Sequence, residues 1–301
     1  SGSGSGAGVG VALAGAGVTK ATSATSSGTV SITGSTSSSS GSTGVNVASS
    51  ITTDGNITIQ GTVTSSSNTG VNIANAVTSY GLGHAININA NYNIVHSGSI
   101  ANTSGGATAS MNLTSTLGSV SGSGTLASNG GIVINTASAG MMSGVISGSG
   151  SLTKDGAGTT ILTATNSYLG ATTISAGILQ IGDGTTTGTL GAGAVTDNAS
   201  LVLNRSDSLT LANAISGTGS LTQSGSGTTI LTGTNHYAGT TTIGAGTLQV
   251  GNGGATGTLG SGAVIDNAAL VFNRAGTLTE TGAISGSGSL TQQGSGTTIL
   301  A

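Results

Sequence analysis

Short runs in which hydrophobic and polar residues alternate occur along most of the chain. In AININANYNI (residues 85–94), isoleucine alternates with asparagine, apart from Tyr92. Successive side chains of a β-strand point to opposite faces, so the run predicts a strand with its isoleucines inside. We expect the asparagines to be solvated at the surface, with a stacked asparagine ladder as the less favoured alternative. Gly, Asn, Asp and Ser separate such runs, which indicates short strands joined by turns.

The second half of the chain is built from copies of one repeat, with no insertions between them. The sequence ISGSGSLT begins at Ile146, and its counterparts begin at Ile215 and Ile284, which gives a period of 69 (215 − 146 = 69; 284 − 215 = 69). One third of this period, about 23 residues, suffices for three strands of about five residues and three turns. We therefore predict an all-β parallel β-solenoid with about three strands per coil of about 23 residues. The copies span residues 146–214, 215–283 and, in part, 284–301.

Comparison of the two complete copies predicts which side chains face the core. Positions that stay aliphatic are expected inside, and their neighbours along the strand outside. Ile178 becomes Thr247, so this position is expected to point outward. Leu211 becomes Glu280, so we expect the inward-facing run to have ended there. The expected inward pairs are Leu179 with Leu248, Ile181 with Val250, Leu201 with Leu270, Leu203 with Phe272, and Leu209 with Leu278.

A repeat of three whole coils would also align equivalent residues along the solenoid axis. On that basis Leu152, Leu221 and Leu290 are expected to occupy one aliphatic column, three coils apart. A single coil buries too few aliphatic side chains to offset the entropy of ordering its backbone, so coils must stack. The absence of proline fits, because an interior coil uses its N–H groups in the ladder. We expect one continuous solenoid.

The first half of the chain shows the same alternation with less regular spacing. Residues 28–48 resemble residues 55–74 at an offset of 27, which predicts a somewhat longer coil. We therefore expect irregular solenoid coils over residues 28–145. Residues 1–27 are rich in Gly, Ser and Ala, and we expect a lead segment or a degenerate first coil.

Composition excludes several functional classes. Charged residues make up only 4% of the chain, whereas about 25% is usual. Four Lys and Arg cannot form a nucleic-acid-binding patch. The longest apolar-leaning run, residues 7–18, is too short for a membrane-spanning helix, which needs about 20 residues. Hydrophobic residues make up 35%, enough for a core, so disorder is not expected.

Residues 148–182 and 217–251 resemble the autotransporter-associated β-strand repeat, also called the passenger-associated transport repeat. The family's lysine is present at Lys154 and replaced by Gln223 and Gln292. The resemblance implies a right-handed parallel β-helix that a translocator exports across a Gram-negative outer membrane and displays outside the cell. It brings no catalytic residues, and residues 28–145 look more like coils of large filamentous-haemagglutinin-like adhesins. Its Asn-x-Tyr-x-Gly element corresponds to Asn166, Tyr168 and Gly170, and to Asn235, Tyr237 and Gly239.

Few residues are candidates for chemistry. Of the seven acidic residues only Asp197 and Asp266 recur with the repeat, and recurrence favours a structural role over a catalytic one. Eight positions after each lies an arginine, Arg205 or Arg274, which indicates either a repeated salt bridge or an aspartate that caps a turn. We therefore expect no catalytic site.

Metal and cofactor sites are not expected either. The three histidines, His84, His96 and His236, are scattered, and cysteine is absent, so the chain offers no ligand set, and the calcium-binding nonapeptide pattern is missing. Tyr168 and Tyr237 occupy equivalent turns. They are either adhesive contacts or, as we favour, rings that cover the end of a coil's core.

These observations favour a non-catalytic structural and adhesive stalk on the bacterial cell surface. The alternative is a subunit of a self-assembling extracellular filament; an ice-binding solenoid and a polysaccharide-active enzyme rank lower. Expected partners are a cell-surface or glycan receptor, other copies of the chain and an outer-membrane translocator. The third copy stops at Ala301, within its first third, so we expect the chain to be part of a longer protein.

Overall fold

The chain folds into strands and turns. A computed structural model describes residues 19–20, 24–26, 28–36, 43–64, 68–80, 82–103 and 109–301, and within those ranges it contains no helix. The chain divides into two compact units, residues 1–160 with 166–170, and residues 161–165 with 171–301. Most of the segment 1–27, expected to be a lead or a degenerate coil, lies outside the described residues.

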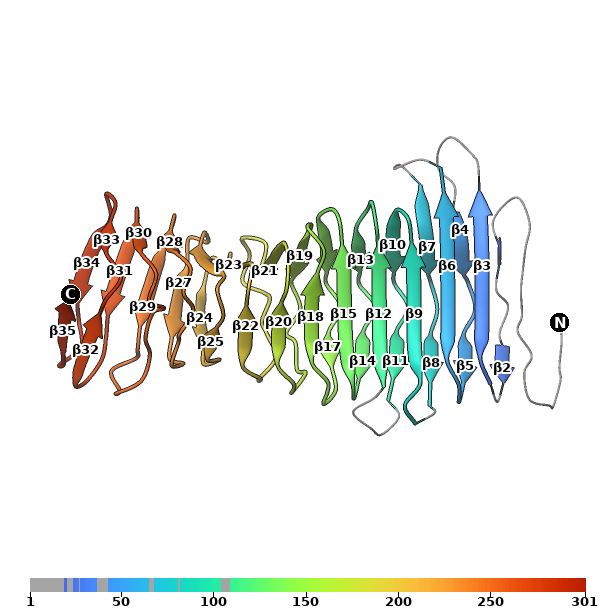
Figure 1. Cartoon of the computed structure of the whole chain (residues 1–301), viewed down its shortest axis with the longest axis horizontal. Coiled ribbons are helices and arrows are strands. Elements are labelled where there is room, and N and C mark those ends of the chain that lie inside the picture. Colours follow the sequence, from blue (N-terminus) through green and yellow to red (C-terminus); the bar gives the residue numbers. More distant parts are fainter. Residues whose placement is uncertain are drawn as a thin grey trace. The chain divides into compact units, whose positions relative to one another are not determined.

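Three parallel sheets make up the first unit, and the chain visits them in turn (Figure 1). One contains, in order, β1 (Thr19–Lys20), β4 (Thr43–Val47), β7 (Thr69–Ile73), β10 (Asn93–His96), β13 (Val120–Gly122) and β16 (Gly140–Met142). The next contains β2 (Ala24–Ser26), β5 (Ile51–Thr53), β8 (Val77–Ser79), β11 (Ile100–Asn102), β14 (Leu126–Ser128) and β17 (Ile146–Ser147). The third contains β3 (Val30–Thr36), β6 (Ile57–Val63), β9 (Ala85–Ala90), β12 (Ser110–Ser115), β15 (Gly131–Thr136) and β18 (Leu152–Asp155).

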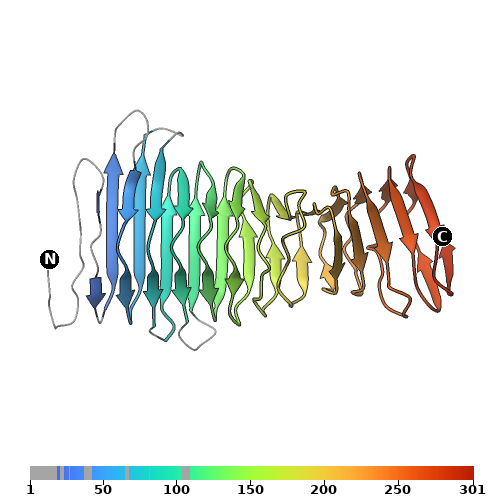
Figure 2. The ribbon, with the colours of Figure 1, turned by 180° about the vertical axis from the view of Figure 1, so that it is seen from behind.

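The second unit has the same plan (Figure 2). Its sheet I contains β21 (Ile178–Ile181), β23 (Ser200–Leu203), β26 (Ser220–Gln223), β28 (Thr241–Ile243), β30 (Val264–Asp266) and β33 (Ile284–Ser285). Sheet II contains β24 (Ser208–Leu211), β27 (Thr228–Leu231), β29 (Thr247–Val250), β31 (Ala269–Phe272) and β34 (Ser289–Gln292). The remaining face, face III, carries β20 (Thr172–Ile174), β22 (Val195–Asp197) and β25 (Ile215–Ser216), and then β32 (Thr277–Glu280) with β35 (Thr297–Leu300); β19 (Thr159–Leu162) spans the boundary between the units.

Strand pairing confirms the predicted parallel β-solenoid. Val30 pairs with Ile57 (57 − 30 = 27), as the similarity of the two segments predicted. In the second unit Thr241 pairs with Val264 (264 − 241 = 23), and Leu221 pairs with Thr241 (241 − 221 = 20). The turns are therefore close to the predicted length but not uniform.

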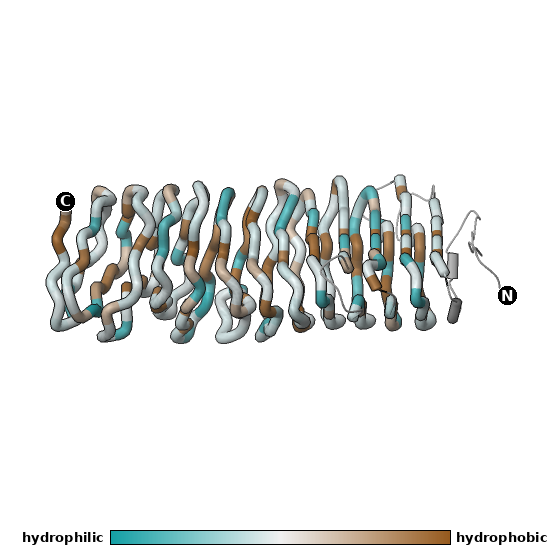
Figure 3. Tube along the Cα trace, turned by 60° about the horizontal axis from the view of Figure 1, so that its bottom comes forward, coloured by the Kyte–Doolittle hydropathy of each residue, from teal (hydrophilic) through white to brown (hydrophobic). Residues whose placement is uncertain are grey.

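Alternation of buried and accessible residues builds the core. In β9, Ile86 and Ile88 are fully buried while Asn87 and Asn89 are partly accessible, as predicted. Figure 3 shows apolar positions recurring from turn to turn. Asparagines also stack, contrary to the favoured expectation, since Asn112 Nδ2 donates to Asn87 Oδ1 at 2.8 Å. The pairing stops after two rungs, because Val133 follows Asn112 in the register.

The predicted inward positions of the repeat are buried with one correction. All five predicted pairs are at most 7% exposed, and Ile178 lies on the outer face. Glu280, however, is 3% exposed, like Leu211 in the preceding copy, so the expectation that the inward run ends there is wrong. Strand alternation continues through β32 and carries the carboxyl inside, where the Gly282 N–H donates to it at 3.4 Å. Burial raises the pKa of this carboxyl.

The predicted single column of equivalent leucines is wrong. Leu221 lies in sheet I, stacked between Leu201 and Thr241, whereas Leu290 lies in sheet II on Leu270. Three turns from Leu221 end at Ile284 (284 − 221 = 63), because two of these turns have a length of 20 rather than 23. Leu290 is six positions farther along, on the next face. Leu152 stacks on Ile132 in the first unit.

Leu221→Asp is expected to lower the free energy of unfolding by several kcal/mol, because a buried carboxylate there has no partner and Leu221 is 1% exposed. Thr222→Asp, one residue along on the outer face, is the matched control and is expected to change it by less than about 1 kcal/mol. Urea unfolding followed by circular dichroism measures both. Equal losses in the two variants would contradict the assigned inward face.

Candidate functional site

Polar side chains end three equivalent strands and bind the turns that follow them; Lys154 and Gln223 are buried, and Gln292 is exposed. Lys154 Nζ donates to the carbonyl oxygens of Asp155 (2.8 Å) and Gly156 (2.7 Å). Gln223 Nε2 donates to those of Gly225 (2.8 Å) and Gly227 (3.3 Å). Gln292 makes the same pair of bonds one repeat later, to Gly294 and Gly296, both at 3.1 Å. In each copy the side chain therefore binds the carbonyl two residues ahead.

The hydrogen bonding of one threonine, which all three copies contain, distinguishes the glutamine copies from the lysine copy. Thr229 Oγ1 donates to Gln223 Oε1 at 2.7 Å, and Thr298 Oγ1 donates to Gln292 Oε1 at 2.8 Å. The equivalent Thr160 is buried, and its hydroxyl has no hydrogen-bond partner within the described residues, since an ammonium group offers no acceptor. Glutamine therefore satisfies both the turn and the threonine, whereas lysine satisfies the turn alone.

Burial also affects the charge of Lys154. The side chain is fully buried, and loss of hydration lowers the pKa of Lys154 to about 8, because the charged form of an amine is disfavoured away from water. The neighbouring Asp155 carboxylate has a smaller, opposing effect on this pKa. The buried positive charge therefore lowers the free energy of unfolding, and the two copies with glutamine at this position avoid that loss. The shared function of the position is to bind turn carbonyls, which needs a donor and no charge.

The Asn-x-Tyr-x-Gly element occupies a face of the solenoid where a strand would otherwise lie. Residues 163–171 and 232–240 contain no strand, and there the asparagine side chain supplies the missing acceptor. Asn166 Oδ1 accepts from the Ile146 N–H at 2.8 Å, and Asn235 Oδ1 accepts from the Ile215 N–H at 2.9 Å. On its other side Asn235 Nδ2 donates to the Thr258 carbonyl at 2.7 Å. The asparagine thereby continues the ladder across the gap.

Both tyrosines of this element lie in the core. Tyr168 is 1% exposed and Tyr237 is fully buried, so neither is an adhesive surface contact. The Tyr237 hydroxyl lies 2.6 Å from Thr241 Oγ1, and burial raises the pKa of Tyr237 to about 12. A β-carbon on Gly260 would collide with the ring, which explains glycine there. The rings fill the space that a missing strand leaves.

Asp197 and Asp266 cap turns. Asp197 Oδ1 accepts from the Ala199 N–H, and Asp266 Oδ1 accepts from the Ala268 N–H, each at 3.0 Å. The alternative salt bridge between Asp197 and Arg205 is wrong, because Arg205 pairs with Asp207 at 2.7 Å. Asp197 is 1% exposed, and burial raises its pKa to about 6 despite the N–H donors.

The two arginines instead hold a loop in each copy. Arg205 Nη1 and Nη2 donate to the carbonyls of Gly188 and Thr186, both at 2.6 Å. Arg274 binds the equivalent carbonyls of Gly257, at 2.7 Å, and Ala255. The counterpart of Asp207 is Gly276, so Arg274 Nε has no hydrogen-bond partner among the described residues.

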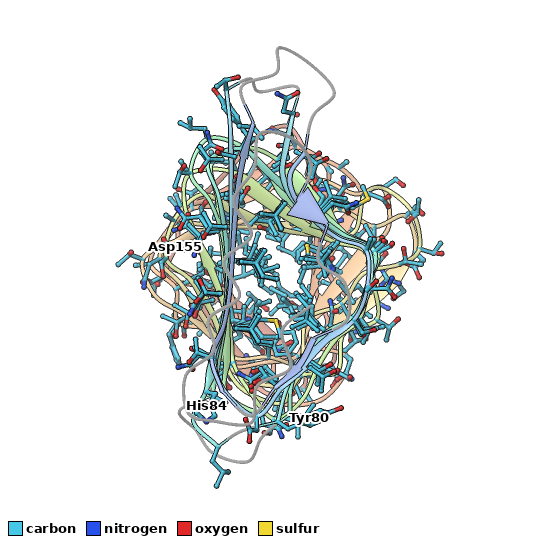
Figure 4. All side chains as sticks on the ribbon, turned by 90° about the vertical axis from the view of Figure 1, so that its right-hand side faces the viewer. Tyr80, His84 and Asp155 are labelled. Atoms are coloured by element: carbon cyan, nitrogen blue, oxygen red, sulfur yellow. The ribbon has the colours of Figure 1, made fainter. Side chains whose placement is uncertain are left out.

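Groups suited to metal binding do not converge within the described ranges. Figure 4 shows Tyr80 and His84 at one end of the cross-section and Asp155 well away from them. His96 is fully buried, and burial lowers its pKa to about 4. The described part of the chain holds no group of three His, Asp or Glu placed to bind a metal ion. It also holds no helix both long and apolar enough to cross a membrane.

Comparison with protein families identifies the repeated segments. Residues 152–181 and 221–250 match the passenger-associated-transport-repeat model, which confirms the resemblance seen in the sequence. The matched segments contain the turn-binding positions Lys154 and Gln223 and the Asn-x-Tyr-x-Gly elements. Comparison with curated proteins and with solved structures finds no match.

Sequence reasoning missed the turn-binding role of Lys154, Gln223 and Gln292. The signal was available, since each follows an inward leucine by two positions and therefore has the phase of a buried position. It also missed the arginine-bound loops, because the carbonyls that they present are main-chain atoms, which a residue pattern does not reveal.

Lys154→Gln is expected to stabilise the first unit at pH 7 by up to about 3 kcal/mol, because it removes a buried charge and gives Thr160 a partner. The folded state disfavours the proton on Lys154, so the wild-type protein loses stability as pH falls from 10.5, the ordinary lysine pKa, through about 8, the lowered pKa. Above pH 10.5 this loss is absent. The advantage of the variant should therefore shrink between pH 8 and pH 10.5. Urea unfolding at several pH values measures it; Gln223→Lys is the reverse control, and an advantage that does not change with pH would contradict the charge argument.

Asp197→Asn is expected to stabilise the second unit at pH 8 by about 3 kcal/mol and to have little effect near pH 4. A raised carboxyl pKa gives stability that is fully present below 3.8 and lost as pH rises through about 6, because the folded state favours the bound proton. Asparagine retains the acceptor for the Ala199 N–H without the charge. Thermal unfolding at pH 4 and pH 8 tests the prediction, and an equal effect at both values would refute it.

Proposed function

We propose that this chain is a rigid, non-catalytic stalk segment of a secreted or surface-displayed bacterial adhesin. The two passenger-associated transport repeats and the β-solenoid fit the passenger of an autotransporter, which is secreted or exposed at the surface. The observation that carries the stalk role is the use of polar side chains. Lys154, Gln223 and Asp197 are buried and bind the backbone of turns, so they serve the scaffold.

The inside of the solenoid supports rigidity. Parallel hydrogen-bond ladders join each coil of the solenoid to its neighbours. Where a strand is missing, the side chain of Asn166 or Asn235 continues the ladder. Stacked repeats share one core, so stability grows with the number of repeats rather than residing in a separate globular fold. Such a scaffold separates whatever lies at its two ends.

The surface supports a passive role as well. Its outward positions are mostly Ser, Thr, Asn and Gly, and only 4% of the chain is charged. Few acid–base groups, which would be needed to activate a serine or threonine hydroxyl, are thus offered to a substrate. A receptor or glycan ligand, and the translocator that would export the chain, belong to the proposal.

Deletion of residues 215–283 from the full-length protein is expected to preserve export, surface exposure and adhesion. Ile284 then follows residue 214 in place of Ile215, and the same sequence pattern continues the solenoid. Flow cytometry with an antibody to the passenger measures exposure, and binding of cells to a host-cell monolayer measures adhesion.

A deletion of residues 215–248 is the matched control. It places Gln249 at the buried position of Ile215 and is expected to impair folding and display, because a polar side chain there lacks a partner. Normal display with loss of adhesion in the whole-repeat deletion would contradict the stalk role and assign binding to the repeat. Cleavage of polysaccharides by the purified chain would contradict its non-catalytic character.

A further inference from the structure

The repeat and the solenoid turn do not have the same period. In the second unit, strands one repeat apart always lie on different faces. β25 on face III corresponds to β33 in sheet I, β26 in sheet I to β34 in sheet II, and β24 in sheet II to β32 on face III. In each of these pairs, the later strand lies on the face that follows the earlier strand's face in chain order. A repeat therefore comprises three turns and one further face.

Turn lengths account for this shift. Val202 pairs with Thr222, Thr222 with Thr242, and Thr242 with Ile265. Three turns of the solenoid therefore advance the chain by 63 residues (265 − 202 = 63). The equivalent of Val202 is Val271, six positions farther along and in sheet II. Six or seven residues are one face of the solenoid. The repeat is thus ten faces long, and three faces make one turn.

Each repeat carries one prominent exposed loop. Residues 183–187 and 252–256 are exposed, while the glycines on either side are buried. Arg205 and Arg274 fasten these loops through their main-chain carbonyls, so each loop has a fixed base and an exposed tip. The first loop follows β21 of sheet I and the second follows β29 of sheet II.

We infer that the repeats form a three-fold screw that presents their arginine-bound loops on successive faces of the solenoid, one loop per face. The same face recurs only after three repeats, which is ten turns or about 48 Å. An elongated partner lying along one face would meet one loop in three.

Spin labels test the screw, and the absence of cysteine from the chain allows labelling at chosen positions. Val202→Cys with Ile265→Cys marks positions three turns apart in one sheet, about 14 Å along the axis. Val202→Cys with Val271→Cys marks positions one repeat apart. Electron paramagnetic resonance is expected to give the longer distance for the second pair, because its labels leave different faces. A repeat of three whole turns would reverse this order.

Two further pairs guard against local distortion by the labels. Thr222→Cys with Ser285→Cys and Thr222→Cys with Thr291→Cys repeat the comparison one turn later, and the same order is expected. All the substitutions lie on the outer face, and circular dichroism checks the fold. The reversed order in both sets would overturn the inference.

Loop display is tested with biotin on Thr186→Cys and Ala255→Cys, whose side chains lie in the two exposed loops. Monovalent streptavidin, which is much wider than the spacing of three turns, is expected to bind both loops of one chain at once. The same-face pair Val202→Cys with Ile265→Cys is expected to bind only one. Mass photometry counts the bound molecules, and a single streptavidin on the loop pair would overturn the radial arrangement.

Discussion

The parallel hydrogen-bond ladder places each residue directly beside its partner one turn away, and the rest of the structure depends on this constraint. An inward residue always faces an inward residue, so Leu179, Leu201 and Leu221 form a continuous aliphatic stack. The ladder satisfies the backbone groups of the strands and some of those between strands, such as the Gly227 N–H, which donates to the Arg205 carbonyl. The remaining buried backbone groups between strands need hydrogen-bond partners too, and side chains can supply them.

Buried polar residues meet that need. Lys154 and Gln223 bind turn carbonyls, Asp197 binds a turn N–H, and Asn235 continues the ladder where the strand is absent. Their recurrence from repeat to repeat therefore reflects the backbone rather than a ligand. It also explains why lysine and glutamine exchange at one position, since the turn requires a hydrogen-bond donor and not a charge. This use of the polar interior is consistent with the stalk role that we propose.

Strands, their inward faces and the solenoid followed from period-two alternation and from comparison of the copies, because burial acts on each strand locally. Register could not be predicted in the same way. It depends on turn lengths, and division of 69 by three suggested uniform coils, whereas the glycine-rich loops lengthen only some turns. Glu280 was misplaced because a carboxylate usually indicates the surface, and the strand carries it inside. The partner of Arg205 was misjudged because the loop that it binds folds back from residues 186–188.

The register of the ladder is the central claim, and a pair of cysteines tests it directly. Thr222 and Thr242 are partners on the outer face of neighbouring turns, and paired β-carbons lie about 5 Å apart, close to the reach of a disulfide. Uniform turns of the predicted length would instead place Ala245 beside Thr222 (222 + 23 = 245). Mild oxidation should join Thr222→Cys to Thr242→Cys rapidly in the folded protein and leave Thr222→Cys with Ala245→Cys reduced. Efficient oxidation of the second pair and not the first would contradict the structure's register.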